Sequence, residues 1–162
     1  MNQDNSIDNV EIDVRRSYYE SGALWYENPY KNGAEHGIAK IYYESGALWV
    51  ESPYVKGKRH GIRKEYFESG ALERVTPYVN GNIHGIEYIY CKSGTILWDI
   101  PYVNGKRHGK LRNYNESGSL LCEVSFVNGS QHGIVKYYDK DKASIRHLTL
   151  YEKDQEVAFI KI

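Results

Sequence analysis

The chain has 162 residues, enough for one domain with a substantial buried interior and too few for two ordinary domains. Its 21 Lys and Arg residues balance its 21 Asp and Glu residues. A neutral chain has no overall field that draws it to nucleic acid or to an anionic membrane, so any charge effect must be local. The chain has 16 Tyr and only three Phe, and aromatic rings with a polar tip suit half-exposed β-strands.

The first thirteen residues are polar and acidic, without the apolar segment of a signal peptide or a membrane anchor. We therefore expect a disordered acidic tail over residues 1–13 and a cytoplasmic protein. Cys91 and Cys122 differ in repeat phase and lack the C-x-x-C spacing of metal sites, so we expect free thiols in a reducing compartment.

A 24-residue repeat dominates the chain. Each unit contains two turn signals, one around a Ser-Gly pair, as in Glu-Ser-Gly at residues 68–70, and one that ends in Gly, as in Asn-Gly at residues 80–81. Runs of strand length separate these signals, so the sequence predicts one β-hairpin per unit. The tyrosines that mark the period are Tyr18, Tyr42, Tyr66, Tyr90, Tyr114 and Tyr138.

The predicted fold class is all-β, an elongated antiparallel β-meander of tandem 24-residue hairpins in one twisted sheet of about twelve strands. We expect a single repeat domain over residues 14–162, with five full repeats from about 18 to 137. Lys142 and Lys153 then stand where glycines are expected, so residues 138–162 are predicted to form a degenerate C-terminal cap.

The predicted strand register assigns side chains to two faces. Counting antiparallel pairs outward from Phe67 and Ala71 matches Tyr66 with Leu72 and places Ile62 opposite Thr76. The predicted apolar face holds Ile62, Tyr66, Leu72 and Tyr78. The predicted solvated face holds Arg63, Glu65, Phe67, Ala71, Glu73 and Pro77, with the equivalents Trp25, Glu27, Trp49 and Glu51. Lys64, Arg112 and Lys136 fall on this apolar face. Either their aliphatic stems lie flat with the charge at the margin, or the register is wrong and the faces are exchanged.

The repeats resemble a known family. Residues 54–61 (YVKGKRHG), 66–72 (YFESGAL) and 102–109 (YVNGKRHG) are similar to the MORN (membrane occupation and recognition nexus) repeat in its bacterial variant form. The resemblance extends over about residues 18–138 and implies rows of hairpins in one extended sheet. It also implies a binding role, because bacterial members are often described as antitoxin-like or immunity-like, and others as lipid or protein scaffolds.

The five in-phase histidines suggest a metal site at first sight. Equivalent residues, however, lie two strands apart, roughly 9 to 10 Å, with parallel side chains, whereas zinc ligands converge at about 2.0 to 2.1 Å. We expect no metal and no cofactor, and instead a structural role in which each imidazole braces its own turn by hydrogen bonds. These structural histidines are His36, His60, His84, His108 and His132.

Catalysis is not expected either. The repeated serines lie at the Glu-Ser-Gly turns and the histidines at the opposite edge of the sheet, so no Ser and His of one unit can meet as a nucleophile and base. The sequence therefore predicts no enzyme.

Two surface features are candidate partner sites. Trp25 and Trp49 share one phase beside Tyr19 and Tyr43, as exposed aromatic anchors do, and burial under the N-terminal tail is the alternative. The His-Gly turns are partly basic, which suits an acidic protein or lipid headgroups, and solvation alone is the alternative. Nucleic acid is not expected. The basic candidates are Lys58, Arg59, Lys106 and Arg107.

These features support two hypotheses. The first is a non-enzymatic protein-binding repeat scaffold of the antitoxin or immunity type, which sequesters a partner protein, such as a toxin encoded nearby, on its sheet surface. The second is a lipid- or surface-associated structural scaffold that binds anionic groups through the basic turns. The sequence leaves the oligomeric state open.

Overall fold

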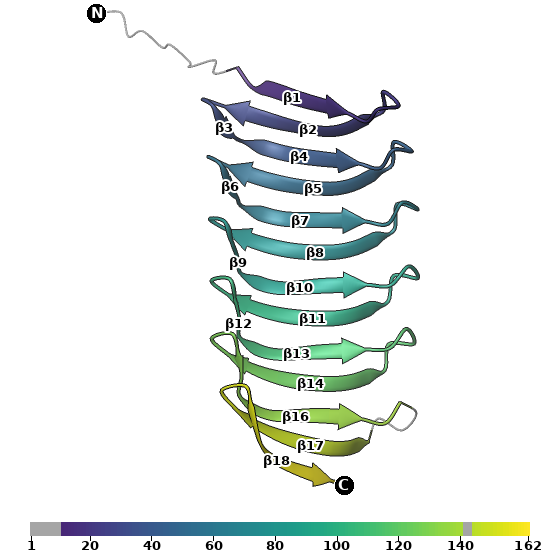
Figure 1. Cartoon of the computed structure of the whole chain (residues 1–162), viewed down its shortest axis with the longest axis vertical. Helices are drawn as coiled ribbons and strands as arrows, with labels where there is room; N and C mark the ends of the chain where they lie inside the picture. The colour runs from purple at the N-terminus through teal and green to yellow at the C-terminus, as the bar shows by residue number, and fades with distance from the viewer. Residues whose placement is uncertain (1–10, 141–143) are drawn as a thin grey trace, which may run out of the picture.

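The computed structural model describes residues 11–140 and 144–162, which form one antiparallel sheet of 18 strands (Figure 1). Successive long strands pair with one another, so the sheet is a meander. Over these residues there is no helix. Figure 1 shows the hairpins stacked along the long axis, with β1 and β18 at opposite ends. The predicted all-β meander of tandem hairpins is confirmed.

Thirteen strands have six to eight residues and five have only two. At about 4.8 Å between neighbours, the thirteen long strands extend over roughly 58 Å. The long strands are β1 (Asp13–Tyr18), β2 (Leu24–Lys31), β4 (Gly37–Tyr42), β5 (Leu48–Val55), β7 (Gly61–Tyr66), β8 (Leu72–Val79), β10 (Gly85–Tyr90), β11 (Ile96–Val103), β13 (Gly109–Tyr114), β14 (Leu120–Val127), β16 (Gly133–Tyr138), β17 (Ile145–Glu152) and β18 (Gln155–Lys161). The short strands are β3 (Ala34–Glu35), β6 (Lys58–Arg59), β9 (Asn82–Ile83), β12 (Lys106–Arg107) and β15 (Ser130–Gln131).

Parts of the predicted termini lie outside the described residues. Residues 1–10 of the predicted tail and Lys142 are among these, and Asp13 begins β1. In the predicted cap, Lys153 and Asp154 connect β17 to β18 with positive φ angles of 48° and 66°. The backbone N–H of Asp154 donates to the carbonyl of Gln131 at 3.0 Å, so this last turn stacks on the preceding unit.

The two turns of each unit form as the sequence predicts. Asn80 and Gly81 have φ angles of 50° and 90°, as the central pair of a two-residue hairpin with a type I′ turn requires. The N–H of Gly81 also donates to the carbonyl of Arg59 at 2.8 Å, which ties the turn to the unit before it. At the other edge, Phe67 N–H donates to Ala71 at 2.9 Å, which confirms this predicted pair.

A β-bulge in each hairpin makes part of the predicted register wrong. Tyr66 pairs with Leu72 as predicted, but the register shifts between Glu65 and Tyr66. One residue of the second strand, Glu73, therefore has no partner residue on the facing strand. Ile62 therefore pairs with Pro77 and not with Thr76. The shift occurs because one residue is inserted into the second strand, and every residue of that strand beyond the insertion changes face.

The face that is buried also differs from the prediction. Face A is the side of the sheet that carries Ala39, Ser52 and Thr76, and face B is the side that carries Ile62, Lys64 and Pro77. Ile62 is 46% exposed, and most buried residues lie on face A, since bulges bend the strands and crowd the side chains of one face. The buried residues of face A are Asn28, Ala39, Val50, Ser52, Thr76, Glu87, Leu111, Phe126, Val135 and Thr149.

Face B carries a cross-strand row of alternating charges. The carboxylate of Glu51 accepts hydrogen bonds from Lys64 Nζ at 2.7 Å and from Tyr66 Oη at 2.9 Å. The same geometry recurs around Glu27 and Asp99, where Tyr42 Oη donates at 2.9 Å and Tyr114 Oη donates at 3.0 Å. Opposite charges on facing strands stabilise the pairing of successive hairpins.

These contacts keep both partners in the protonation state that the row needs. The hydrogen bond from Lys64 lowers the pKa of Glu51, which therefore remains ionised at neutral pH. Burial, followed by the hydrogen bond to Glu27, raises the pKa of Tyr42 to about 12, so its phenol remains a donor.

Replacing Glu51 by Gln should lower stability by at most about 1 kcal/mol, because Lys64 is partly exposed and the pair is screened by solvent. The folded-state pKa of Glu51 lies below its unfolded value of about 4.3, so its contribution is complete above that pH and is lost as the pH falls through the folded-state pKa. Urea unfolding of both proteins between neutral and acidic pH tests this. An equal difference at every pH would contradict it.

Gly61→Ala should destabilise the protein by about 2 kcal/mol or more, because φ is +111° and a Cβ would lie 3.1 Å from Pro53 Cγ. Gly70→Ala is the matched control, since φ is +85° and no atom lies within 4 Å of its Cβ. Denaturant midpoints should therefore rank Gly61→Ala below Gly70→Ala. Equal midpoints would show that the contact with Pro53 is not limiting.

Candidate binding surface

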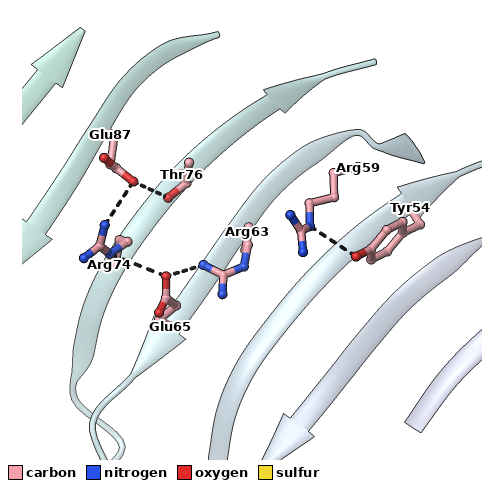
Figure 2. Close-up of polar contacts among 7 residues, drawn as sticks. All are labelled: Tyr54, Arg59, Arg63, Glu65, Arg74, Thr76 and Glu87. Atoms are coloured by element: carbon pink, nitrogen blue, oxygen red, sulfur yellow. Dashed lines mark hydrogen bonds and ion pairs between the residues drawn. The ribbon is translucent and has the colours of Figure 1, made fainter. Parts of the chain in front are cut away.

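A cluster of charged side chains lies on face A between β5 and β10 (Figure 2). We call it the arginine–glutamate cluster, and its charged members come from β6, β7, β8 and β10. Figure 2 shows these side chains reaching toward one another across adjacent strands. The charged members are Arg59, Arg63, Glu65, Arg74 and Glu87.

Four of these charges form one chain of ion pairs. The Arg63 guanidinium donates to Glu65 Oε1, and Arg74 Nε lies 3.4 Å from the same oxygen. Arg74 Nη1 also lies 3.4 Å from Glu87 Oε1. Thr76 Oγ1 donates to that Glu87 oxygen at 2.9 Å. The side chain of Glu87 is only 7% exposed, and a buried carboxylate needs such charged and hydroxyl partners.

Arg59 lies at the margin of the cluster and is held by aromatic rings. Its Nε donates to Tyr54 Oη at 3.1 Å, and its guanidinium carbon lies 5.7 Å and 5.5 Å from the ring centroids of Tyr54 and Tyr78. Two units later, Arg107 lies 4.3 Å above the ring of Phe126. Arg59 and Arg107, the two arginines of the predicted basic turns, therefore contact aromatic rings. Lys58, next to Arg59 in β6, is exposed.

Sequence reasoning missed the cluster, although a signal for it was present. Arg63 occupies the repeat position of Ala39, and Glu65 occupies that of Ile41. Arg74 likewise stands at the position of Val50. Charges at positions that are apolar in the preceding unit are departures from the period, and three of them fall within twelve residues. The bulge register is what brings them into contact with Glu87.

The four predicted aromatic residues lie together at the Glu-Ser-Gly end of the first hairpins. The Tyr43 and Trp49 ring centroids are 5.5 Å apart, and those of Tyr19 and Trp25 are 6.3 Å apart. Trp25 is 45% exposed and Trp49 is 38% exposed. The tyrosines are anchored to the next hairpin, because Tyr43 Oη donates to the carbonyl of Tyr66 at 2.9 Å. These two aromatic pairs form a fixed, partly exposed surface.

The predicted basic residues do not join the aromatic pairs. Lys58 and Arg59 form β6, and Lys106 and Arg107 form β12, at the opposite edge of the sheet from the Glu-Ser-Gly turns (Figure 1). Four long strands separate β6 from β12, or roughly 19 Å at the usual strand spacing. The predicted partner residues therefore belong to separate patches.

The imidazoles of three repeated histidines, His60, His84 and His108, contact the turn of the following unit. His60 Nδ1 accepts from the backbone N–H of Asn80 at 3.4 Å, and His108 Nδ1 accepts from that of Asn128 at 3.4 Å. His84 Nδ1 lies 3.3 Å from Asn104 Oδ1. Within the described part of the chain, no three His, Cys, Asp or Glu side chains gather as metal ligands would. Nor does that part contain a helix able to span a membrane.

The sequence of the hairpins identifies their family. The model of the MORN repeat variant matches residues 14–32, 35–56, 59–80 and 107–128, which together exceed half of the chain. The chain belongs to the MORN repeat variant family. Repeats of this family are non-catalytic binding repeats. Comparison with curated proteins returns no match. The matched segments omit residues 81–106, where β10 and β11 form a hairpin with the same bulge as the others.

Glu65→Gln should destabilise this MORN repeat protein by about 1–3 kcal/mol, because Arg63 and Arg74 share its carboxylate and would be left with a neutral partner. Glu68→Gln, at an exposed turn of the same unit, should change stability by no more than about 0.5 kcal/mol. Denaturant unfolding compares the two variants. Equal effects would mean that the cluster contributes no more than surface charge does.

Proposed function

We propose that this MORN repeat protein is a non-enzymatic protein-binding scaffold that sequesters a partner protein on face A, in the manner of an antitoxin or immunity protein. The observation that carries the proposal is the pairing of the exposed Trp25 and Trp49 rings with Tyr19 and Tyr43, respectively, on rigid hairpins. Aromatic side chains held at low entropic cost are the usual anchors of protein interfaces.

The size of face A supports a protein partner. Long strands of six to eight residues are roughly 20 Å long, and the sheet extends over roughly 58 Å, so the projected face exceeds about 1,000 Å². A standard interface buries about 800 Å² on each partner. Face A also offers the arginine–glutamate cluster, whose compensated charges favour polar recognition over attraction to one sign of charge.

A cytoplasmic location and a partner encoded nearby are part of the same proposal.

The double variant Trp25→Ala and Trp49→Ala should weaken capture of the neighbouring gene product by tenfold or more, about 1.4 kcal/mol, because anchors contribute most of the binding energy. Ile38→Ala and Ile62→Ala is the matched control, since both isoleucines are comparably exposed on face B. Calorimetry and co-expression with that gene product measure affinity and relief of toxicity.

Failure of the unmodified protein to form a complex or to relieve toxicity would remove the antitoxin assignment. Equal losses in both double variants would place the interface elsewhere than on the aromatic pairs.

A lipid- or surface-associated scaffold is the second candidate, favoured by the exposed basic pairs in β6 and β12. Anionic vesicles should then bind the protein in a salt-dependent way, and binding should be lost when all four residues are reversed to Glu. Sedimentation with neutral vesicles is the control. Absence of binding to anionic vesicles at low salt would exclude this candidate. The four residues are Lys58, Arg59, Lys106 and Arg107.

A further inference from the structure

A small pocket lies on face A at the N-terminal side of the arginine–glutamate cluster. Its volume is about 100 Å³, and its lining residues come from strands β2 to β7. We call it the Asn28–Ser52 pocket. Six of its lining residues are Asn28, Glu35, Ala39, Ser52, Arg59 and Arg63.

Two buried polar atoms of this pocket lack partners. Asn28 is 3% exposed and Ser52 is 5% exposed, yet among the residues that the structure describes Asn28 Oδ1 and Ser52 Oγ have no hydrogen-bond partner. The orientation of the Asn28 amide is fixed, because Nδ2 donates to Glu35 Oε1 at 2.7 Å and a reversed amide would set oxygen against oxygen. An unsatisfied buried polar atom costs about 1–3 kcal/mol, which a bound group with matching atoms would recover.

The charges around the pocket balance. Arg59 and Arg63 contribute two positive charges, and Glu35 and the Arg63 partner Glu65 contribute two negative ones. A group that enters this pocket therefore gains little from carrying a net charge.

The polar atoms of the pocket require both a donor and an acceptor from its occupant. Asn28 Oδ1 only accepts, whereas the guanidinium of Arg63 only donates and the hydroxyl of Ser52 does both. A carboxylate cannot donate, and an ammonium or guanidinium group cannot accept. A neutral carboxamide does both, and a volume of about 100 Å³ suits a group of that size or about three water molecules.

We propose that the Asn28–Ser52 pocket binds a carboxamide, the Gln or Asn side chain of a partner protein docked on face A. The proposal rests on the proposed function, which supplies that partner. Arg59 is exposed, and turning its side chain away from Tyr54 and Tyr78 would leave the backbone pairing of β6 intact and give the amide a way in.

The test uses the full-length ¹⁵N-labelled protein and three small probes of matched size, propionamide, propionate and ethylguanidinium. Propionamide should produce saturable shifts in the side-chain signals of Asn28 and Arg63, and the two charged probes should bind about tenfold more weakly or not at all. Propionate or ethylguanidinium binding as tightly as propionamide would overturn the proposal. So would a pocket that holds only water, with no probe shifting these signals.

The double variant Asn28→Leu and Ser52→Ala should abolish the propionamide shifts while keeping the fold, because it removes the two unsatisfied atoms. Thr149→Val is the matched control, since Thr149 is 4% exposed in the same cross-strand row but far from the pocket. It should leave the shifts unchanged, and propionamide shifts that survive the double variant would overturn the site.

Failure of this site and failure of the proposed function give different results. If the partner binds through Trp25 and Trp49 with no dependence on Asn28 and Ser52, the scaffold stands and the amide site is wrong. If propionamide binds but the protein captures no partner, the amide pocket stands and the scaffold function is wrong.

Discussion

The structure depends on cross-strand pairing within a single sheet. Over the described residues no second layer covers either face, so each side chain is packed and charge-compensated mainly by side chains one strand away. With a period of 24 residues, two strands per unit and one bulge per hairpin, this pairing decides which residue types can follow one another across the sheet. On face B the residues that face one another along the row alternate in charge, as at Lys40, Glu51 and Lys64.

One interruption of that row shows how strict the constraint is. Val75 replaces the carboxylate of its unit, and the residue opposite it, Tyr88, replaces the base. The two changes together exchange an ion pair for an apolar contact, and Tyr90 lies beside Tyr88 with ring centroids 6.4 Å apart. Burial raises the pKa of Tyr90. The equivalent tyrosines of other units donate a hydrogen bond to a carboxylate, and Val75 stands at that carboxylate's position.

The same constraint leaves face A with polar atoms that the sheet itself does not pair. Its central row is mostly polar or charged in the first units, at Asn28, Ser52 and Arg63 with Ala39 among them, and mostly apolar in the later ones, at Leu111 and Val135, before it ends at Thr149. In the apolar units the side chains of this row pack against one another. In the arginine–glutamate cluster the charges are compensated by ion pairs. Among the described residues, Asn28 Oδ1 and Ser52 Oγ in the Asn28–Ser52 pocket have no such partner. A partner's polar group would supply what the sheet itself does not.

The sequence alone determined the period, the hairpin, the positions of both turns and the separation of serines from histidines, because glycine spacing and local turn chemistry act within a few residues. Only the tertiary structure decided which face is buried, since one inserted residue per hairpin exchanges the faces of every second-strand residue beyond it, including Tyr78. It also decided the contacts of Arg63, Glu65 and Arg74. These residues are ordinary surface charges in the sequence, and they become a cluster only when the bulged register places them on one face with Glu87.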